Sequence, residues 1–216
     1  MRSAEILGCK ERDVLILDEE AFKDGMNEEW DEKEVSKLLM KGFGPEAVKI
    51  SASLSSSTTS SKQHTTKSDA PISTIDILLT FDVQGVSSHP NHIALYHGAV
   101  HFLKTLLHTK HGYASPVDIY TLSSVGWFRK YAGMADVVWS LVEMAFGRNG
   151  NPWARKKAMK ARGKEERLLF VSDLEGMVAG WKAMVTAHKS QMRWFRWGWI
   201  GLSRYMYIND LKRVKI

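Results

Sequence analysis

Residues 75–92 read IDILLTFDVQGVSSHPNH, and this stretch decides the fold of the chain. Its first six residues, Ile75 to Thr80, form a nearly continuous apolar run, which predicts a strand lying centrally in a covered sheet. Its last four residues place two imidazoles, those of His89 and His92, three positions apart at the start of a helix-like segment. The stretch therefore predicts a buried strand, a polar loop and the beginning of a helix.

A helix and a second strand are predicted directly after this stretch. Residues 91–110 fit a helix, and residues 117–122 fit another strand. A strand, a helix and a strand at this spacing form a βαβ unit, which implies parallel pairing with a right-handed crossover. We therefore expect an α/β chain with a Rossmann-like, three-layer fold and a mostly parallel sheet. The helix is expected to bury one apolar stripe, made of Ile93, Tyr96, Val100, Leu103 and Leu107.

Other parts of the chain fit further elements of an α/β domain. Residues 1–7 read as the end of a helix that closes at Gly8, and nothing upstream begins that helix. We therefore expect the domain to be N-terminally truncated. Apolar runs predict two short strands and helical periodicity predicts two more helices. These elements are the strands Val14–Leu17 and Leu168–Val171 and the helices over residues 31–41 and 173–188.

Two segments interrupt this pattern of strands and helices. Of the 18 residues from Ser51 to Ser68, 12 are Ser or Thr, which predicts a disordered insert over residues 51–70. Residues 147–167 contain eight Lys and Arg residues and a turn signal, which predicts a basic linker. Around these segments we expect a single domain over residues 1–216.

The composition bounds the class of protein. With 216 residues and 44% hydrophobic residues, the chain can bury one substantial core. The single cysteine, Cys9, excludes an internal disulfide and a cysteine-rich zinc module, and it fits a reducing compartment. The sequence contains no run of about 18 apolar residues, so it predicts no transmembrane helix. The N-terminus also lacks the apolar core of a signal peptide.

The charge is distributed unevenly along the chain. Residues 1–147 carry 14 Lys/Arg against 19 Asp/Glu, whereas residues 148–216 carry 16 against 5. This basic last third predicts an anionic partner such as phospholipid head groups, phosphates or nucleic acid, or else a solvated basic surface. Within it, Arg193, Arg196 and Arg204 alternate with Trp and Tyr residues. That pattern suits a bilayer interface or single-stranded nucleic acid, besides core packing.

The loop after the first predicted strand holds the candidate chemistry. Ligands of open α/β sheets collect outside the carboxyl ends of the strands, so Asp82, His89 and His92 are expected to face one crevice. A neutral imidazole is a good zinc ligand, and a second imidazole nearby can stabilise developing negative charge, so this pattern indicates a metal-dependent hydrolase. The alternative is that the histidines cap or pack the helix start. His97 and His101 are expected on the solvated helix face, with metal binding as the less favoured interpretation.

Three stretches carry a resemblance to a known family. Residues 81–92, residues 188–196 (HKSQMRWFR) and residues 203–211 (SRYMYINDL) resemble the eukaryotic N-acetylglucosaminyl-phosphatidylinositol de-N-acetylases, which are LmbE-like zinc deacetylases. The resemblance runs along the chain and is interrupted by the Ser/Thr insert and the basic linker. It implies an LmbE-type fold and removal of acetate from GlcNAc-phosphatidylinositol during GPI-anchor biosynthesis. It also implies a location at the cytosolic face of the endoplasmic reticulum membrane.

The resemblance also implies roles for particular residues. In the family, the second histidine of the His-Pro-Asn/Asp-His motif binds zinc and the first stabilises the tetrahedral intermediate, which gives these roles to His92 and His89. We assign substrate binding to Asp82, His188 and Arg193. The family's other zinc ligands and its general base lie in a His-Pro-Asp-Asp-Glu motif, which this sequence lacks. The resemblance therefore implies an incomplete zinc site and weak hydrolysis by the chain.

Two other interpretations remain beside the enzyme. A non-catalytic protein could retain the fold and use its basic aromatic surface to bind phosphoinositides or a membrane surface. A nucleic-acid binder could use the C-terminal aromatic and basic stretch. We expect GlcNAc-phosphatidylinositol and the endoplasmic reticulum membrane surface as partners, and no nucleic acid.

Overall fold

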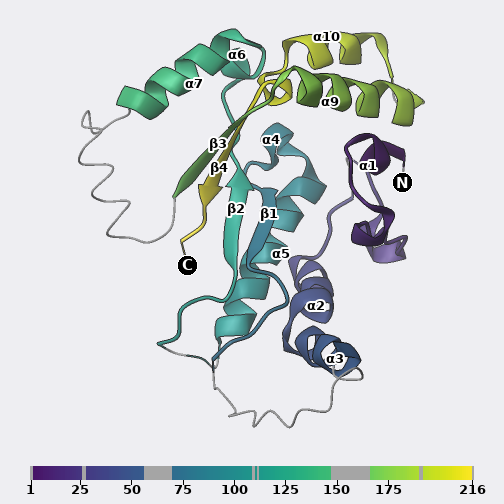
Figure 1. The fold of residues 1–216 in the computed structure, drawn as a ribbon, viewed down its shortest axis with the longest axis vertical. Coiled ribbons are helices and arrows are strands. Elements are labelled where there is room, and N and C mark those ends of the chain that lie inside the picture. Colours follow the sequence, from purple (N-terminus) through teal and green to yellow (C-terminus); the bar gives the residue numbers. More distant parts are fainter. Residues whose placement is uncertain are drawn as a thin grey trace. The chain divides into compact units, whose positions relative to one another are not determined.

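The structure is a computed structural model that describes residues 2–25, 28–55, 70–108, 110, 112–146, 166–189 and 192–215 (Figure 1). Its contacts divide the chain into two compact units. Unit 1 comprises residues 1–18 and 125–211, and unit 2 comprises residues 19–124 and 212–216. A single deacetylase-like domain over residues 1–216 stays a prediction. The basic linker, up to residue 165, lies outside the described residues.

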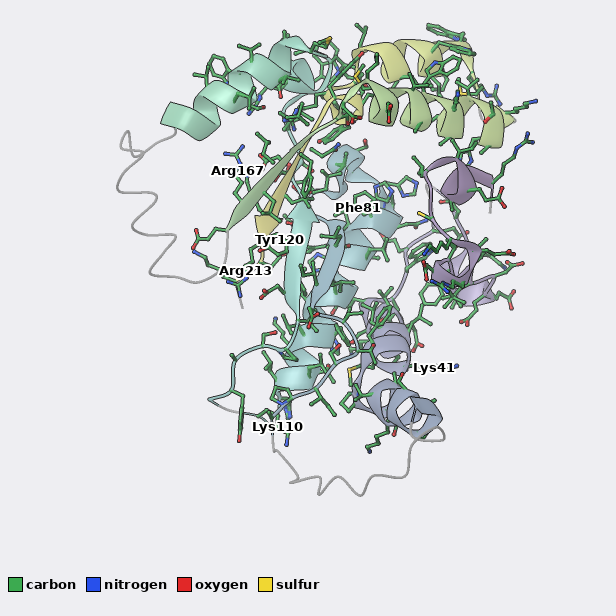
Figure 2. The ribbon with its side chains drawn as sticks, in the orientation of Figure 1. Lys41, Phe81, Lys110, Tyr120, Arg167 and Arg213 are labelled. Carbon is green, nitrogen blue, oxygen red and sulfur yellow. The ribbon has the colours of Figure 1, made fainter. Side chains whose placement is uncertain are left out.

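Unit 2 contains the predicted βαβ unit. Strand β1 (Ile77–Phe81) pairs in parallel with β2 (Asp118–Leu122), with Ile77 opposite Asp118 and Phe81 opposite Leu122. Helix α5 (Pro90–Leu107) joins the two strands and packs against both. Figure 2 marks Phe81 at the end of β1 and Tyr120 in the buried strand β2. The sequence prediction of these three elements is confirmed to within three residues at each end.

Helix α5 buries a different stripe from the predicted one. Among the five predicted residues only Leu103 is fully buried; the core cluster consists of Ala99, Phe102, Leu103, Leu106, Val117 and Ile119. The reason is helix α2 (Glu32–Phe43), which packs on α5 at Gly98. A Cβ atom at Gly98 would lie 2.3 Å from Val35 Cγ1, so only glycine permits this close approach. The small residues of α5 therefore face α2, a helix that the periodicity of residues 31–41 predicted but whose packing on α5 it did not reveal.

This packing also corrects the expected solvated face of α5. The Nδ1 atom of His101 lies 3.0 Å from Ser36 Oγ of α2, and Ser36 is 3% exposed. His97 Nδ1 lies 3.9 Å from Glu32 Oε2, at the start of α2. The two histidines therefore lie beside α2, while Lys104 and His108 are exposed.

Two predictions near the start of the chain were wrong or incomplete. Val14–Leu17 forms no strand, and the side chain of Leu15 is 81% exposed, because none of the strands in the described ranges pairs with this apolar run. Helix α3 (Pro45–Ser55) continues into the segment predicted to be disordered. Residues 56–69 of that segment lie outside the described residues. Helix α1 (Arg2–Ile6) does end as predicted, with Gly8 at a φ of 80°.

Unit 1 contains the other two strands and several helices. Strand β3 (Arg167–Val171) lies next to β4 (Ile208–Arg213), and an ion pair of 2.5 Å joins Arg167 to Asp210. The chain between these strands forms α9 (Leu174–Ala187), α10 (Trp194–Leu202) and the 3-10 turn η5 (Arg204–Met206). Asp173 caps α9 by accepting a hydrogen bond from Gly176 N. Unit 1 also contains the helices α6 (Trp127–Lys130) and α7 (Ala135–Phe146).

The α/β class is confirmed, but the prediction of a mostly parallel sheet was wrong. The described strands have the order β1-β2-β4-β3, and the sheet is mostly antiparallel. A single crossover helix returns the chain to the starting end of the sheet and gives a parallel neighbour, as between β1 and β2. Two helices lie between β3 and β4, so the chain returns to the end of the sheet at which β3 stops. There, just after β3 and just before β4, Ser172 N donates a hydrogen bond to Tyr207 O at 2.8 Å. The βαβ rule, which predicts parallel pairing, therefore applies to β1 and β2 but not to β3 and β4.

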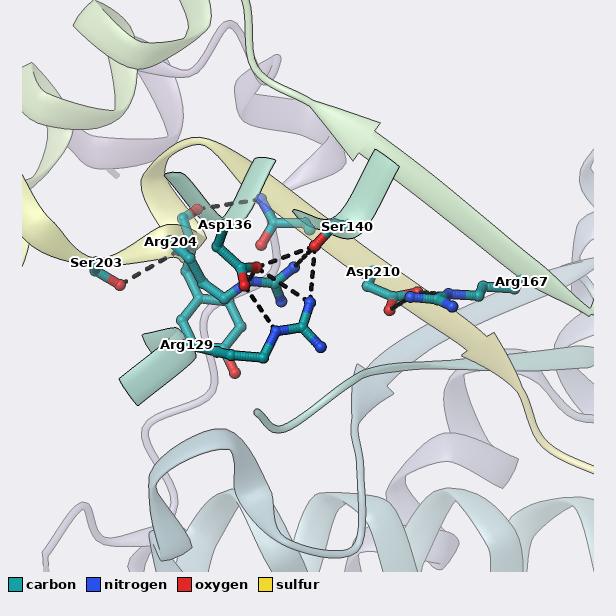
Figure 3. A network of polar contacts seen from close by, with 9 residues as sticks. Arg129, Asp136, Ser140, Arg167, Ser203, Arg204 and Asp210 are labelled. Carbon is teal, nitrogen blue, oxygen red and sulfur yellow. Dashed lines mark hydrogen bonds and ion pairs between the residues drawn. The ribbon is translucent and has the colours of Figure 1, made fainter. Parts of the chain in front are cut away.

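A buried ionic network organises unit 1 (Figure 3). Asp136 in α7 and Arg204 in η5 are 2% and 0% exposed, and Arg204 Nε donates to Asp136 Oδ2 at 2.5 Å. Arg129 of α6 donates to Asp136 Oδ1 at 2.7 Å, and Ser140 Oγ donates to Asp136 Oδ2 at 3.0 Å. Among the described residues, Arg204 Nη1 has no hydrogen-bond partner. Two guanidinium groups on one carboxylate thus link α6, α7 and η5.

This network should make the stability of unit 1 depend on acid pH. Burial by itself raises the pKa of Asp136, but hydrogen bonds from Arg129 and Ser140 and the charge of Arg204 outweigh it and hold the pKa below 3.8. Stability from such a group is present above the unfolded pKa and is lost as the pH falls through the folded pKa. We therefore expect the thermal midpoint, followed by circular dichroism, to fall steeply below about pH 4.

The substitution Asp136→Asn should remove this acid dependence, whereas Asp13→Asn should leave it intact, because Asp13 is exposed. An identical pH dependence in wild-type protein and Asp136→Asn would contradict the assignment.

Candidate active site

The loop after β1 brings two imidazoles together. Phe81, the last residue of β1, stacks on the ring of His92 with the ring centroids 3.8 Å apart and the planes inclined by 10°. The ring of His89 lies 5.0 Å from that of His92. Pro90 begins α5 and His89 is its N-cap. The aromatic stack and the helix start therefore fix both rings at the carboxyl end of β1, as the sequence predicted.

The hydrogen bond of His92 determines its neutral tautomer. His92 Nδ1 lies 3.0 Å from the carbonyl oxygen of Gly85. A carbonyl oxygen can only accept, so Nδ1 carries the proton and the lone pair is on Nε2. An imidazole whose Nδ1 proton is held by a backbone carbonyl is the usual arrangement of a metal-binding histidine. His92 therefore presents a ligand atom, Nε2, in the orientation that its predicted role requires.

His89 has the opposite tautomer. The backbone N–H of Asn91 donates to His89 Nδ1 at 3.3 Å, so this nitrogen carries the lone pair and the proton of the neutral ring is on Nε2. His89 Nε2 lies 4.0 Å from Asp24 Oδ1, and the same oxygen accepts from Asn91 Nδ2 at 3.0 Å. His89 therefore presents a hydrogen-bond donor where His92 presents an acceptor.

Asp82 is engaged in holding the loop. Its carboxylate accepts hydrogen bonds from the Ser124 N–H at 2.5 Å, the Ser124 hydroxyl at 2.6 Å and the Gln84 N–H at 3.1 Å. The Ser124 hydroxyl also accepts from Val86 N at 2.9 Å. Asp82 thus connects the ends of β1 and β2. Its local contacts fix the loop, and its predicted role in substrate binding stays a prediction.

The loop backbone is strained where it turns. Gly85, Val86 and Ser88 have φ angles of 62°, 61° and 57°. Positive φ is unfavourable for residues with a Cβ, above all for a β-branched residue such as Val86. The hydrogen bonds from Val86 N to Ser124 Oγ and from His92 Nδ1 to the Gly85 carbonyl oxygen hold this conformation. Such strain is common at functional sites, where surrounding contacts maintain it.

Gly85 should be intolerant of a side chain. A Cβ atom there would lie 3.0 Å from Ile93 Cγ1 and 3.1 Å from His92 Cβ. Gly85→Ala should therefore lower the free energy of unfolding by about 1 to 3 kcal/mol, measured by urea denaturation. Gly112→Ala is the matched control, because Gly112 also has positive φ but nothing lies within 4 Å of its Cβ position. Equal losses in the two variants would show that crowding of His92 is not involved.

Three residues of this site, Ser124, Asn91 and Asp24, were not predicted from the sequence. Ser124 follows β2 just as Asp82 follows β1, and parallel strands end at the same edge of a sheet, so its position was a usable signal. Asn91 lies inside the predicted motif and is 3% exposed, and its Oδ1 has no hydrogen-bond partner among the described residues. Asp24 lies far from the motif in the sequence, and no pattern pointed to it.

His188 and Arg193 lie in unit 1. His188 follows α9, Arg193 is the N-cap of α10, and both are exposed. Asp82, His89 and His92 belong to unit 2, and a role of His188 and Arg193 in substrate binding stays a prediction.

The residues present fit zinc only in part. His92 Nε2 is a suitable donor, but the described part of the chain contains no group of three His, Cys, Asp or Glu side chains that could hold a metal ion. A catalytic zinc site normally has three protein ligands. The role of His92 as a zinc ligand therefore stays a prediction. Within the described ranges, none of the helices is long and apolar enough to cross a membrane.

The sequence is similar to named de-N-acetylases along nearly its whole length. It is 45% identical over 228 residues to the N-acetylglucosaminyl-phosphatidylinositol de-N-acetylase of Arthroderma benhamiae, covering 98% of this chain and 64% of that protein. It is 32% identical to the probable enzyme of that name from Schizosaccharomyces pombe, covering 93% and 60%. The identity to the Bos taurus protein of that name is 26%, covering 98% and 62%.

The chain thus spans a little under two thirds of the length of these relatives. No protein family profile matches the chain, and no solved structure matches it. The similarity confirms the resemblance that was predicted from residues 81–92, 188–196 and 203–211. The chain belongs to the family of the N-acetylglucosaminyl-phosphatidylinositol de-N-acetylases.

Proposed function

We propose that this chain forms part of an enzyme that hydrolyses the acetamide of GlcNAc-phosphatidylinositol, a step of GPI-anchor biosynthesis. The observation that carries the proposal is the pair of opposite tautomers at the end of β1. His89 offers an N–H and His92 offers a lone pair, with the ring centroids 5.0 Å apart. Amide hydrolysis needs both kinds of group near the carbonyl. The names of the relatives supply the substrate.

In this proposal the imidazole rings of His89 and His92 have different roles. The Nε2 proton of His89 would donate a hydrogen bond to the oxyanion that develops when water attacks the acetamide carbon. His92 Nε2 would be one ligand of a zinc ion. A zinc ion in that position would supply polarisation of the carbonyl and activation of water. Asp82 and Ser124 would keep the loop rigid, so that neither ring has to be reoriented during the reaction.

We place the reaction at the cytosolic face of the endoplasmic reticulum membrane. The substrate is a lipid whose sugar projects from a bilayer, and the last third of the chain is basic, with 16 Lys/Arg against 5 Asp/Glu in residues 148–216. Such a surface is attracted to anionic head groups.

A second candidate function follows from the incomplete metal site. Because the described residues supply one metal ligand rather than three, the chain could act as a non-catalytic protein that binds phosphoinositides at a membrane surface. That candidate predicts salt-sensitive binding to phosphoinositide vesicles without acetate release.

The test measures acetate release from GlcNAc-phosphatidylinositol by the protein with zinc supplied. We expect His89→Ala to lower the rate by about a hundredfold to a thousandfold, the usual cost of losing one oxyanion donor. His97→Ala is the matched control, since His97 lies on the same helix and is half-exposed beside α2. Absence of acetate release from wild-type protein, with phosphoinositide binding retained, would favour the second candidate.

A further inference from the structure

Helix α10 exposes an apolar face that carries no charge. Positions 194, 197, 198 and 201 follow the i, i+3, i+4, i+7 spacing, and positions 195 and 202 lie beside them. Trp194 is 86% exposed, Phe195 54%, Trp197 49% and Leu202 57%. Gly198 and Gly201 complete the face, and nothing lies within 4 Å of their Cβ positions. A helix that exposes three large aromatic rings presents a surface that water solvates poorly.

The opposite side of α10 is already used for packing. Ile200 is 4% exposed, and Arg196 and Trp199 are partly buried. Trp194 and Phe195 lie on the other side of α10, with 86% and 54% of their surface exposed, and are available to a partner.

Helix α9 continues the same surface. Leu174, Val178 and Trp181 recur at helical spacing and are 75%, 42% and 43% exposed. The rings of Trp181 and Trp197 lie 6.4 Å apart and join the two helices, which run side by side in Figure 1. A groove of about 280 Å³ between α9 and α10 is lined by these residues together with Met206 and Tyr207. We use the name aromatic face for a set of exposed residues on these two helices. The set consists of Leu174, Val178 and Trp181 of α9 and Trp194, Phe195, Trp197, Gly198, Gly201 and Leu202 of α10.

Charges flank the aromatic face at one end. Exposed Lys182 lies in the last part of α9, Lys189 follows α9, and Arg193 caps α10 next to Trp194. The acidic residues of α9, Asp173 at its cap and Glu175, lie at the opposite end of that helix. Trp194, the most exposed tryptophan among the described residues, thus follows Arg193 directly, and the sequence from residue 176 to residue 202 contains no carboxylate.

We propose that the aromatic face docks on an anionic lipid bilayer, with Trp194, Phe195 and Trp197 at the depth of the head groups. Tryptophan is enriched at that depth, where its ring is apolar and its N–H remains hydrated. Cations next to the rings pair with lipid phosphates, and each contributes to the attraction of the surface. An amphipathic helix that lies in the interface in this way binds reversibly and without crossing the bilayer.

This inference deepens the proposed function, because it gives the enzyme a surface on which to meet a lipid substrate. It can nevertheless be tested separately. Vesicles that contain phosphatidylserine but no GlcNAc-phosphatidylinositol report docking alone, and a water-soluble substrate analogue reports hydrolysis alone. Failure of one measurement therefore leaves the other informative.

The first experiment measures co-sedimentation of the protein with vesicles of phosphatidylcholine containing phosphatidylserine. Trp194→Ala combined with Trp197→Ala should lower the partition coefficient by about tenfold or more. Lys182→Gln combined with Lys189→Gln should lower it by roughly thirtyfold on anionic vesicles at low salt. Trp139→Ala is the matched control, because Trp139 of α7 is 64% exposed and lies outside the aromatic face. It should change the coefficient by less than about twofold.

A second experiment reports docking without truncating the aromatic face. Cys9, the only cysteine, is replaced by serine, and Gly198→Cys carries an environment-sensitive fluorophore. Vesicles should shift its emission to the blue, and a lipid-borne quencher should reduce it. Absence of vesicle binding by wild-type protein, an equal loss in Trp139→Ala, or binding to single-stranded nucleic acid that depends on the same tryptophans would overturn the proposal.

Discussion

Replacing His92 by alanine should remove bound zinc and lower acetate release by more than about a hundredfold. Disturbing a residue that only supports a metal ligand costs about 10-fold to 100-fold in affinity or activity, so loss of the ligand itself should cost more. The Gly85 carbonyl holds the Nδ1 proton of His92, and Phe81 stacks on its ring. Zinc content after gel filtration and the rate of acetate release are the two measurements.

His101→Ala controls for damage to α5. His101 lies in the same helix and is partly buried against Ser36 of α2, so its loss should affect stability while leaving zinc content unchanged. Retention of zinc by His92→Ala would contradict the assignment of His92 as a ligand, whatever happens to the rate.

Replacing Asp136 by alanine should lower the free energy of unfolding by about 3 to 5 kcal/mol, the usual cost of removing one partner from a buried ion pair. The loss is large because Arg204 is fully buried and would keep its charge without a carboxylate. Arg204 Nη1 already lacks a partner among the described residues, so the site has no spare acceptor. Urea denaturation followed by fluorescence measures the change.

A paired substitution separates the charge from the packing. Asp136→Leu combined with Arg204→Met replaces the buried pair by apolar groups, and such replacements are often neutral. Most of the lost stability should therefore return in this double variant, while Asp13→Ala at an exposed site should have little effect. If the double variant is less stable than Asp136→Ala, the network acts through shape rather than through charge.

The local pattern was enough to predict the elements around residues 75–122, because the strands and helix there satisfy short-range rules. The position of α2 was not predictable in the same way. It depends on Gly98, whose missing side chain admits Val35 from a segment more than 60 residues away in the sequence. Likewise, the apolar run Val14–Leu17 has the composition of a strand, but a strand needs a partner, and no local rule supplies one.

In the candidate site, too, the local pattern predicted some features, whereas others depend on contacts between distant residues. The His-x-x-His motif predicted that His89 and His92 lie together, since three residues at a helix start leave little freedom. Their tautomers depend instead on the carbonyl of Gly85 and the N–H of Asn91, which act as partners only in the folded loop. Asp24 reaches the site from 65 residues before His89 and has no motif of its own. Residue types can therefore suggest a site, but contacts determine what each nitrogen can do.

The last residues of the chain return to unit 2 after α10 and η5 have completed unit 1. There, Val214 N donates to Ile119 O at 2.8 Å, and Arg213 Nη2 donates to Asp118 Oδ1 at 2.6 Å. Asp118 is only 9% exposed, so the guanidinium group of Arg213 pairs with a nearly buried carboxylate. Arg213 and Val214, which lie 95 residues after their partners in β2, therefore help to hold the βαβ unit together.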